Sequence, residues 1–440
     1  MGILIRGGRV VDAAAQIDKI ADVYLDDGVI QKVGEKLEAK DKDDKIIDAK
    51  GLVVMPGLVD LHVHFRDPGQ TEKEDIETGS HAAARGGVTT VVAMPNTTPV
   101  IDSPDRANYV KNKAAQVSAI HVLQAGAMTK GELGEELSDI AGMAAAGVPV
   151  LSEDGKSVMK ASLCKQAMEE AVKAGLPIFD HCEDMSLRGN GCMNEDENAK
   201  RLGLPGICNS TEDTIAARDS LLAIETGAKL HLCHCSTKGV AIMMKMLKAE
   251  GIENVTAEVC PHHFILTSDD IERDDPNYKM NPPLRTRADV EALRQGLKDN
   301  IMDVISTDHA PHSAQEKAQS MEKAPFGIVG LETSVALTIT ELVEPGILTP
   351  MQMAEKMSYN PAKVLGIDKG SLAEGKPADI TIIDPDAEYV IDTRTFFSKG
   401  KNTPFNGKKV KGLVRATICD GKIAYLESSR EAYRPKTQEN

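Results

Sequence analysis

The sequence predicts an α/β protein: a (β/α)8 TIM barrel with a small β-sandwich domain formed by both chain ends. From residue 56 to about 365, apolar runs of strand length alternate with amphipathic or alanine-rich helical stretches, which is typical of a parallel sheet built from βα units. Short β-rich runs with turn signals occupy both ends of the chain. The predicted domains are therefore 1–55 (sandwich), 56–365 (barrel) and 366–440 (sandwich and polar tail).

Each element follows from local signals. In the N-terminal part, Asp27-Gly28 separates two β-rich runs, which is a strong hairpin signal, and Asp420-Gly421 lies in the same context near the other end. The eight predicted barrel strands are 58–64, 88–93, 119–124, 148–152, 177–181, 229–233, 255–259 and 302–307. The helical stretches that follow most of them are 74–85, 105–115, 135–145, 157–174, 211–226 and 237–249.

Composition excludes several classes of function. The chain has 440 residues, which fits a barrel plus a smaller domain. Only 3% of residues are aromatic, none is Trp, and the formal charge is -16, which argues against nucleic acid and anionic lipid as partners. The eight cysteines form no CxxC pair, so reduced thiols are expected. Without a signal-peptide core or an apolar run of membrane length, we expect a cytoplasmic protein with no membrane partner.

Candidate metal ligands follow the predicted barrel strands. His62 and His64 end the first strand, and side chains two residues apart on a strand point to the same face. The later candidates each follow another strand, and they are Asp154, His181, His234 and Asp308. Because a (β/α)8 barrel presents its chemistry at the C-terminal ends of its strands, four imidazoles and two carboxylates are expected to converge on one mouth.

This set of nitrogen and oxygen ligands suits two borderline cations, with zinc as the first choice and a carboxylate able to bridge them. Two metals that share a water can lower its pKa from about 15.7 to roughly 7 and can polarise a neighbouring carbonyl. The predicted reaction class is metal-assisted hydrolysis. We assign Asp308 as the catalytic group that takes the proton of the hydroxide and gives it to the leaving nitrogen.

The strand-one His-x-His, the later single histidines and the terminal aspartate, flanked by a two-ended sandwich, resemble the amidohydrolase superfamily. Longer motifs resemble the bacterial class I dihydroorotases, and the match runs from the first barrel strand to about residue 425. These motifs are His64-Phe-Arg-Asp-Pro-Gly69, Ala93-Met-Pro-Asn-Thr-Thr98, Lys279-Met-Asn-Pro-Pro-Leu-Arg285, Thr307-Asp-His-Ala-Pro-His312 and Ala324-Pro-Phe-Gly-Ile-Val-Gly-Leu-Glu-Thr333.

The resemblance implies zinc-dependent, reversible hydrolysis of (S)-dihydroorotate to N-carbamoyl-L-aspartate in pyrimidine (UMP) biosynthesis. It implies a first zinc on His62, His64 and Asp308, a second on His181 and His234, and a bridge by Asp154 and a hydroxide. Many relatives carry a carboxylated lysine as the bridge. The aspartate in Ser-Glu-Asp154-Gly therefore favours this subgroup over hydantoinases.

The resemblance also implies a substrate site made of His64, Arg66, Asn96, Asn281, His312, Phe326 and Gly327. The planar guanidinium of Arg66 can hold the substrate carboxylate by two parallel hydrogen bonds, which a lysine cannot do. The segment 309–330 is expected to fold over the substrate as a lid. A homodimer is expected, and some class I members associate with aspartate transcarbamoylase.

Simpler interpretations exist for several residues. His81, His121 and His231 are expected to be structural. His262 and His263 follow the seventh strand, and a role in orienting ligands is weighed evenly against packing. Cys182, Cys233 and Cys235 are expected to pack rather than to bind metal. For Arg66, a surface salt bridge is the alternative to substrate binding. Glu183 could orient a ligand or be solvated.

Two other functions compete with this interpretation. A hydantoinase or allantoinase would use a similar site on another cyclic amide. A non-catalytic scaffold would keep the barrel and lose its metal ligands. Because all of the expected ligand positions are filled, the sequence favours catalysis.

Overall fold

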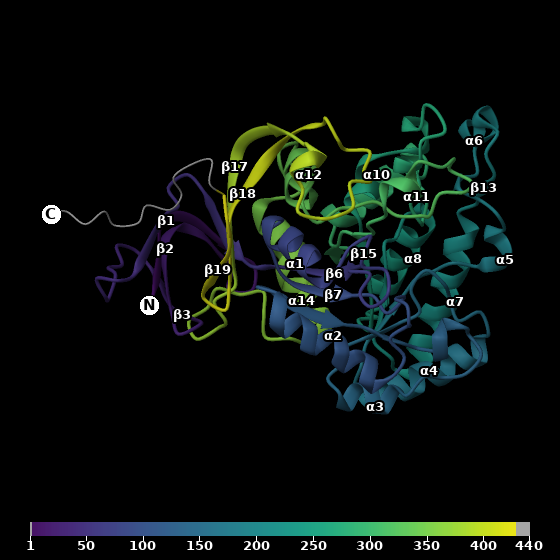
Figure 1. Cartoon of the computed structure of the whole chain (residues 1–440), viewed down its shortest axis with the longest axis horizontal. Helices are drawn as coiled ribbons and strands as arrows, with labels where there is room; N and C mark the ends of the chain where they lie inside the picture. The colour runs from purple at the N-terminus through teal and green to yellow at the C-terminus, as the bar shows by residue number, and fades with distance from the viewer. Residues whose placement is uncertain (1, 428–440) are drawn as a thin grey trace.

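Both ends of the chain form one eight-stranded sheet (Figure 1). The computed structural model describes residues 2–427, so the expected polar tail lies outside the described residues. The strands pair in the order β19-β18-β17-β5-β1-β2-β3, with β4 beside β1. They are β1 (Ile3–Asp12), β2 (Ile17–Asp26), β3 (Val29–Gly34), β4 (Lys45–Asp48), β5 (Val53–Pro56), β17 (Ile380–Val390), β18 (Lys409–Cys419) and β19 (Lys422–Leu426).

The two chain ends meet where β5 pairs antiparallel with β17, with Val54 opposite Ile382. Both residues belong to a hydrophobic cluster that is separate from those of the parallel strands. The two chain ends therefore share one sheet, whereas the predicted β-sandwich domain stays a prediction.

Two tight turns confirm the hairpin signals. Asp27 and Gly28, between β2 and β3, have φ values of 50° and 77°. Asp420 and Gly421, between β18 and β19, have φ values of 48° and 71°. Two successive residues with positive φ form the turn whose twist matches that of the flanking strands, which explains the Asp-Gly sequence at both places.

The middle of the chain contains parallel strands, as predicted from the alternating pattern. One three-stranded sheet runs β6-β7-β8 and one six-stranded sheet runs β16-β15-β14-β11-β10-β9. The strands are β6 (Leu58–Val63), β7 (Val88–Ala93), β8 (His121–Gln124), β9 (Gly126–Ala127), β10 (Leu151–Ser152), β11 (Ile178–Asp180), β14 (Leu230–Leu232), β15 (Val255–Val259) and β16 (Val304–Ile305).

Short contacts link the two parallel sheets at both of their edges. The chain continues from β8 into β9 through Ala125, whose N–H donates to Ala93 O at 2.9 Å. After β16, His309 pairs with Val63 in a parallel bridge, and His64 N donates to His309 O at 2.8 Å. The first and last parallel strands are thereby brought together.

Helices follow the parallel strands and surround them in Figure 1. They are α1 (Ile76–Arg85), α2 (Pro104–Val117), α3 (Ile140–Ala145), α4 (Ala161–Ala174), α5 (Met185–Arg188), α6 (Glu197–Leu202), α7 (Ser210–Thr226), α8 (Lys238–Ala249), α9 (Pro261–Ile265), α10 (Arg287–Lys298), α11 (Ala314–Lys317), α12 (Ser334–Thr338), α13 (Pro350–Ala354) and α14 (Asn360–Leu365). Shorter 3-10 or π-helical turns are η1 (Lys130–Glu132), η2 (Ser268–Asp270), η3 (Pro276–Tyr278), η4 (Ile339–Val343), η5 (Glu355–Tyr359) and η6 (Thr393–Thr395). A small pair, β12 (Met193–Asn194) and β13 (Gly206–Ile207), was not predicted.

Two helices begin later than the pattern predicted, each for a local reason. The helix expected at 157–174 begins at Ala161, because Ser157 contacts the loop after β11 instead. The Ser157 hydroxyl donates to His181 O at 2.6 Å and accepts from Glu183 N at 3.0 Å. The helix expected at 135–145 begins after Asp139, whose carboxylate caps it by accepting from Gly142 N. Capping side chains of this kind define where a helix can start.

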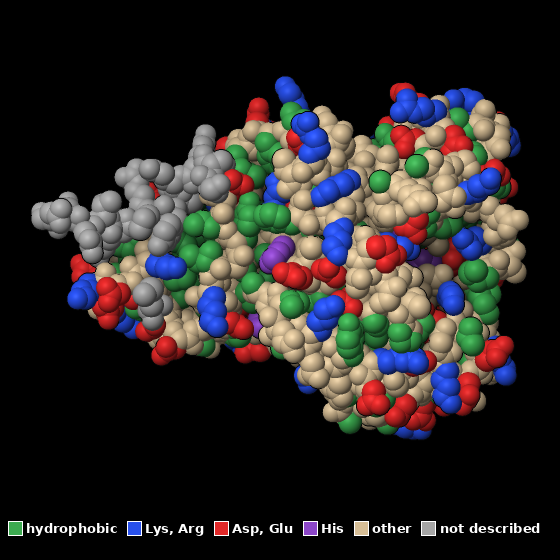
Figure 2. Space-filling model, viewed as in Figure 1, with side chains coloured by type: hydrophobic (Ala, Val, Ile, Leu, Met, Phe, Trp, Pro, Cys, Tyr) green, Lys and Arg blue, Asp and Glu red, His purple; other side chains and the backbone are tan. Residues whose placement is uncertain are grey.

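Charged side chains of both signs lie on the visible surface, where Figure 2 shows Lys and Arg interspersed with Asp and Glu. Among residues 2–427, the structure contains no helix with the length and apolar character needed to cross a membrane. All eight cysteines are free thiols, as expected.

Candidate metal centre

The predicted metal ligands lie together at the carboxyl ends of the parallel strands. His62 is in β6 and His64 follows it, while the others follow β10, β11, β14 and β16. All six side chains are buried, with 0% of His62 and 6% of Asp308 exposed to solvent. Parallel strands bring their carboxyl ends to one edge of a sheet, which explains how residues so far apart in the sequence converge.

Asp154 lies between two groups of ligands. On one side, its carboxylate oxygens are 3.1 Å from His62 Nε2 and 3.5 Å from His64 Nε2. On the other side, Oδ1 is 3.8 Å from His181 Nδ1 and 4.0 Å from His234 Nε2. Asp308 completes the first group, with Oδ1 at 3.2 Å from His64 Nε2.

The donor atoms fit divalent cations. Among the described residues, the buried atoms His62 Nε2 and Asp154 Oδ1 lie 3.1 Å apart but make no hydrogen bond, although buried polar atoms normally do. His181 Nδ1 and His234 Nε2 face one another at 2.9 Å. Imidazole nitrogens and carboxylate oxygens that converge without other partners are the donor set of zinc and its first-row neighbours.

Electrostatics favour the metal-binding form of two of the ligands, Asp154 and His234. Burial alone would raise the pKa of Asp154, but the nearby imidazoles of His62 and His64 outweigh it and hold this pKa well below its usual range. Burial lowers the pKa of His234 well below the usual value, so its imidazole is neutral. Deprotonated carboxylate and neutral imidazole are the forms that ligate a cation. Burial alone would lower the pKa of His62 and His181, but the Asp154 carboxylate raises the pKa of His62 well above its usual value and Glu183 raises that of His181.

Two neighbours, Asn96 and Glu183, orient the ligand rings. His64 Nδ1 donates to Asn96 Oδ1 at 3.0 Å, and Asn96 Nδ2 donates to Asp154 Oδ2 at 2.7 Å. His181 Nε2 lies 3.3 Å from Glu183 Oε2, to which it donates. These bonds leave His64 Nε2 and His181 Nδ1 facing the centre. Of the two interpretations left open for Glu183, the structure therefore supports the orienting one.

Glu258, in β15, was not recognised from the sequence. Its Oε1 accepts from His234 N at 3.1 Å and lies 3.4 Å from His62 Nδ1, while Oε2 accepts from His231 Nε2 at 3.1 Å. Glu258 is fully buried. Burial alone would raise its pKa, but the bonds from His231 and His62 hold it well below the usual value. A charged residue inside an apolar strand was the available signal, because a buried charge needs a partner.

The expected substrate residues surround the metal ligands. Arg66 is buried, which excludes the surface salt bridge, and its Nε donates to Pro311 O at 3.3 Å while Nη2 lies 3.4 Å from His312 Nε2. His312 Nε2 donates to Phe326 O at 2.7 Å. Asn281 Nδ2 is 3.3 Å from His181 Nε2. Asn96 and Asn281 thus contact predicted ligands directly, whereas Arg66, His312 and Phe326 contact one another.

Gly327 follows Phe326 and lies close to Ala310. Its φ is 128°, and a Cβ placed there would lie 2.6 Å from Ala310 Cβ, so glycine allows the two loops to touch. The proposed lid, 309–330, contains α11 and is attached to a neighbouring segment, because Lys317 Nζ donates to Pro276 O at 2.9 Å and to Lys279 O at 3.2 Å. Movement of this lid stays a prediction.

The remaining cysteines and histidines near the centre make protein contacts. Cys182 Sγ donates to the Asp180 carboxylate at 3.1 Å, and Cys235 Sγ donates to Leu232 O at 3.5 Å. Burial raises the pKa of both thiols, which favours their neutral form and hence packing. His263 Nε2 donates to Pro282 O at 2.9 Å and so supports the segment that carries Asn281.

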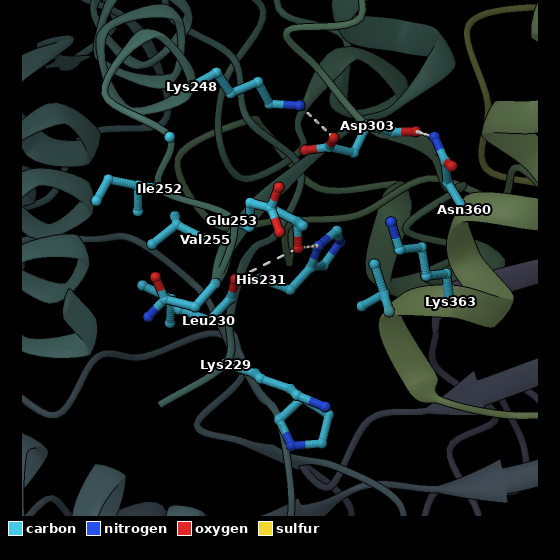
Figure 3. Close-up of a pocket in the computed structure, with 15 residues that line it drawn as sticks. Lys229, Leu230, His231, Lys248, Ile252, Glu253, Val255, Asp303, Asn360 and Lys363 are labelled. Carbon is cyan, nitrogen blue, oxygen red and sulfur yellow. Dashed lines mark hydrogen bonds and ion pairs between the residues drawn. The ribbon is translucent and has the colours of Figure 1, made fainter. Parts of the chain in front are cut away.

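The other three histidines are distant from the predicted ligands or satisfied by other partners. His121 Nε2 lies 2.8 Å from Lys369 Nζ, and His81 is on the exposed face of α1. His231 lines a cavity of about 610 Å³ at the opposite ends of the strands, where β14 and β15 begin (Figure 3). His231 Nδ1 is 2.8 Å from Thr256 Oγ1 there, so it is a satisfied structural residue, as expected.

Comparison with known proteins agrees with this geometry. A family profile described as "Dihydro-orotase-like" matches residues 51–240, and one described as "Amidohydrolase family" matches residues 325–425. The dihydroorotase of Pelotomaculum thermopropionicum is 47% identical over 96% of this chain and 98% of its own. That of Clostridioides difficile is 48% identical over 96% and 99%.

Solved structures show the same fold. The L-hydantoinase (dihydropyrimidinase) of Arthrobacter aurescens superposes with a TM-score of 0.85 at 27% identity, covering 96% of this chain and 95% of that one. The D-hydantoinase of Thermus sp. gives a TM-score of 0.82 at 26% identity, with 97% and 96% covered. The buried cluster of histidines and aspartates, together with these relatives, identifies a metal-dependent hydrolase. The chain belongs to the dihydroorotase family of amidohydrolases.

Proposed function

We propose that the protein is a dihydroorotase of the class I type, which hydrolyses (S)-dihydroorotate reversibly to N-carbamoyl-L-aspartate in pyrimidine synthesis. The observation that carries the proposal is the position of Asp154 between two groups of histidines, in a chain that shares nearly half of its residues with dihydroorotases over almost its full length. An aspartate at this position supports class I. We propose that a closed (β/α)8 barrel, residues 56–365, carries the site, and that residues 1–55 and 366–440 form a β-sandwich.

Two divalent cations, which we propose to be zinc, fit the donor atoms. His62, His64 and Asp308 would hold the first, His181 and His234 the second, and Asp154 would contact both. A cation bound in such a site polarises a carbonyl oxygen and lowers the pKa of a water molecule toward neutrality. The chain itself supplies the imidazoles, the ionised carboxylate of Asp154 and the hydrogen bonds with Asn96 and Glu183 that keep the ligand atoms directed inward.

Arg66, Asn96, Asn281 and His312 are the proposed substrate-binding side chains, with backbone groups of Phe326 and Gly327. The buried guanidinium of Arg66 supplies the positive charge that an anionic substrate needs in a protein with a formal charge of -16. Two parallel N–H donors match a carboxylate and fix its orientation. The substrate ring would thereby be held with its amide beside Asp308.

Asp308 is the proposed proton carrier. Its Oδ1 lies 3.2 Å from His64 Nε2 and 3.7 Å from His62 Nε2, so it borders the place where water attacks the ring carbonyl. As the new C–O bond forms, the Asp308 carboxylate accepts the proton of the water. It then delivers that proton to the ring nitrogen as the C–N bond breaks, so that one group acts as base and as acid.

The test is a hydrolysis assay with dihydroorotate, hydantoin and allantoin on purified protein, combined with elemental analysis of its metals. We expect turnover of dihydroorotate, and a loss of about 100-fold or more in kcat for Asp308→Asn with its metal retained, because the amide cannot accept the proton. Exclusive turnover of hydantoin or allantoin would contradict the substrate assignment. Wild-type protein that takes up no zinc would favour the scaffold alternative, and unimpaired Asp308→Asn would refute the proton-transfer role.

The remaining expectations are proposals of the same kind. A homodimer in the cytoplasm, with association to aspartate transcarbamoylase as in some class I members, is consistent with the family. Light scattering of the purified protein, alone and mixed with aspartate transcarbamoylase, measures both assemblies.

A further inference from the structure

A short segment from the C-terminal part of the chain lies against the loops of the proposed substrate site. This segment, residues 398–402, which we call the strap, lies within the connection between β17 and β18. Asn402, at its end, is 4% exposed. It is distant in the sequence from every predicted ligand and substrate residue, and none of the sequence motifs includes it.

The side chain of Asn402 uses all of its hydrogen-bonding groups on one loop. Its Oδ1 accepts from His312 N at 3.0 Å. Its Nδ2 donates to Ala310 O at 3.1 Å and to Gly327 O at 3.0 Å. In addition, the backbone carbonyl of Asn402 accepts from Val329 N at 2.9 Å. One residue thus joins both ends of the loop that carries His312 and Gly327.

The rest of the strap is held close to the same region. A Cβ on Gly400 would lie 2.6 Å from Pro311 Cβ, so the absence of a side chain allows the strap to touch the loop. At the other end of the strap, Lys399 N donates to Glu74 Oε1 at 3.2 Å, and Ser398 Oγ donates to Oε2 of the same residue. Glu74 Oε2 also lies 3.4 Å from His309 Nε2, beside Asp308.

We propose that Asn402 is a positioning residue for substrate binding, which fixes the base of the 310–329 loop so that His312, Phe326 and Gly327 face the substrate. This inference rests on the proposed function of that site. Its physical basis is the geometry of the amide: one acceptor and two donors match the His312 N–H and the two carbonyls, and hydrogen-bond partners left unpaired in a buried site cost free energy. Movement of the lid is then confined to residues 313–326, between the two attached ends.

The test compares three variants that separate the acceptor from the donors. Asn402→Ala removes both. Asn402→Asp has the same shape and keeps the acceptor for His312 N, but offers no N–H to the carbonyls. Asn406→Ala, on the exposed stretch after the strap, removes an amide that accepts from Thr393 N and serves as the matched control.

We expect KM for dihydroorotate to rise about tenfold in Asn402→Ala while kcat stays within about threefold, because substrate binding loses pre-organised partners. Metal content should not change. Backbone amide hydrogen exchange should accelerate at His312 in the alanine variant and stay slow in the aspartate variant. Exchange at Val329, which bonds to the backbone of Asn402, should stay slow in both, and Asn406→Ala should match the wild type throughout.

Wild-type KM together with slow exchange at His312 in Asn402→Ala would overturn the inference. Because Asn402→Asp is isosteric, its KM decides the matter if the alanine variant does not fold, and a wild-type KM there would equally contradict the need for the two donors. Should the wild-type protein not hydrolyse dihydroorotate, the proposed function fails, while the exchange measurement still tests the attachment of the loop.

Discussion

At the scale of single residues, Glu258 illustrates how a buried carboxylate can orient predicted metal ligands. One of its oxygens approaches both His62 Nδ1 and His234 N, and the other accepts from His231. This arrangement directs His62 Nε2 toward Asp154 and increases the basicity of the ring. We therefore expect the charge of Glu258 to contribute to the affinity for a cation.

Replacing Glu258 by Gln keeps its size and removes its charge. We expect the Kd for zinc to rise roughly 10- to 100-fold, as is usual when a partner of a metal-binding histidine is changed. Competition of the apoprotein with a chromophoric chelator measures this Kd without reference to catalysis. Glu253→Gln, on an exposed residue just before the same strand, is the control, and an unchanged Kd for Glu258→Gln would exclude the role.

The sequence predicted the roles of residues at strand ends, but not of residues whose contacts are remote in the sequence. His62, His181 and His234 each end or follow an apolar run, so the barrel rule alone predicted their convergence. Asn402 bonds to loop backbone that is remote in the sequence, and nothing in its local sequence indicates this. Glu258 lies between the two cases, because its charge inside a strand required a partner that only the structure identifies.

At the scale of elements, helix α1 packs closely against the loop that follows β6. Gly79 is buried in this helix, and a Cβ on it would lie 2.4 Å from Phe65 Cδ1. Phe65 is 2% exposed and separates His64 from Arg66 along the chain. The glycine thus lets the helix approach the loop that carries a metal ligand and a proposed substrate residue.

Gly79→Ala should destabilise the protein although alanine favours helices. The gain in helix propensity is about 1 kcal/mol, whereas overpacking against the buried Phe65 ring costs about 1–3 kcal/mol. Displacement of that ring would also disturb the neighbouring Arg66. We expect a lower urea midpoint. Glu77→Ala, on an exposed position of the same helix, should leave the midpoint nearly unchanged. A midpoint for Gly79→Ala at or above that of the wild type would show that Phe65 can move freely.

Element boundaries were predictable where periodicity was long and unpredictable where a side chain decided them. The strands 88–93 and 255–259 coincide with β7 and β15. The two-residue strands β12 and β13 are too short for any period to be seen. The start of α4 depends on Ser157, which bonds to the loop around His181, a contact that local sequence does not reveal.

At the scale of the whole molecule, the metal centre joins segments from five different parts of the chain. The predicted ligands lie in or after β6, β10, β11, β14 and β16, so a cation held there would connect these strands in addition to their hydrogen bonds and their shared hydrophobic cluster. A ligand that binds the folded protein alone stabilises it by mass action.

Removing the metal by chelation should lower the Tm by about 3 °C or more, since a cation at 100 times its Kd contributes about 2.7 kcal/mol. Differential scanning calorimetry before and after dialysis against a chelator measures the change. Adding zinc back should restore the Tm, whereas magnesium should not, because imidazole ligands prefer zinc. An identical Tm with and without metal would contradict a centre shared by these strands.

The sheet shared by both chain ends has a consequence for how the protein is made. The partner of β5 is β17, which leaves the ribosome only after the whole region of parallel strands has been synthesised. Until then β5 presents an open edge of N–H and C=O groups, and pairing across so long a separation is slow. A nascent chain that stalls before β17 therefore keeps an unpaired strand edge that can pair with other chains. Synthesis and pairing of β17 remove this risk of aggregation.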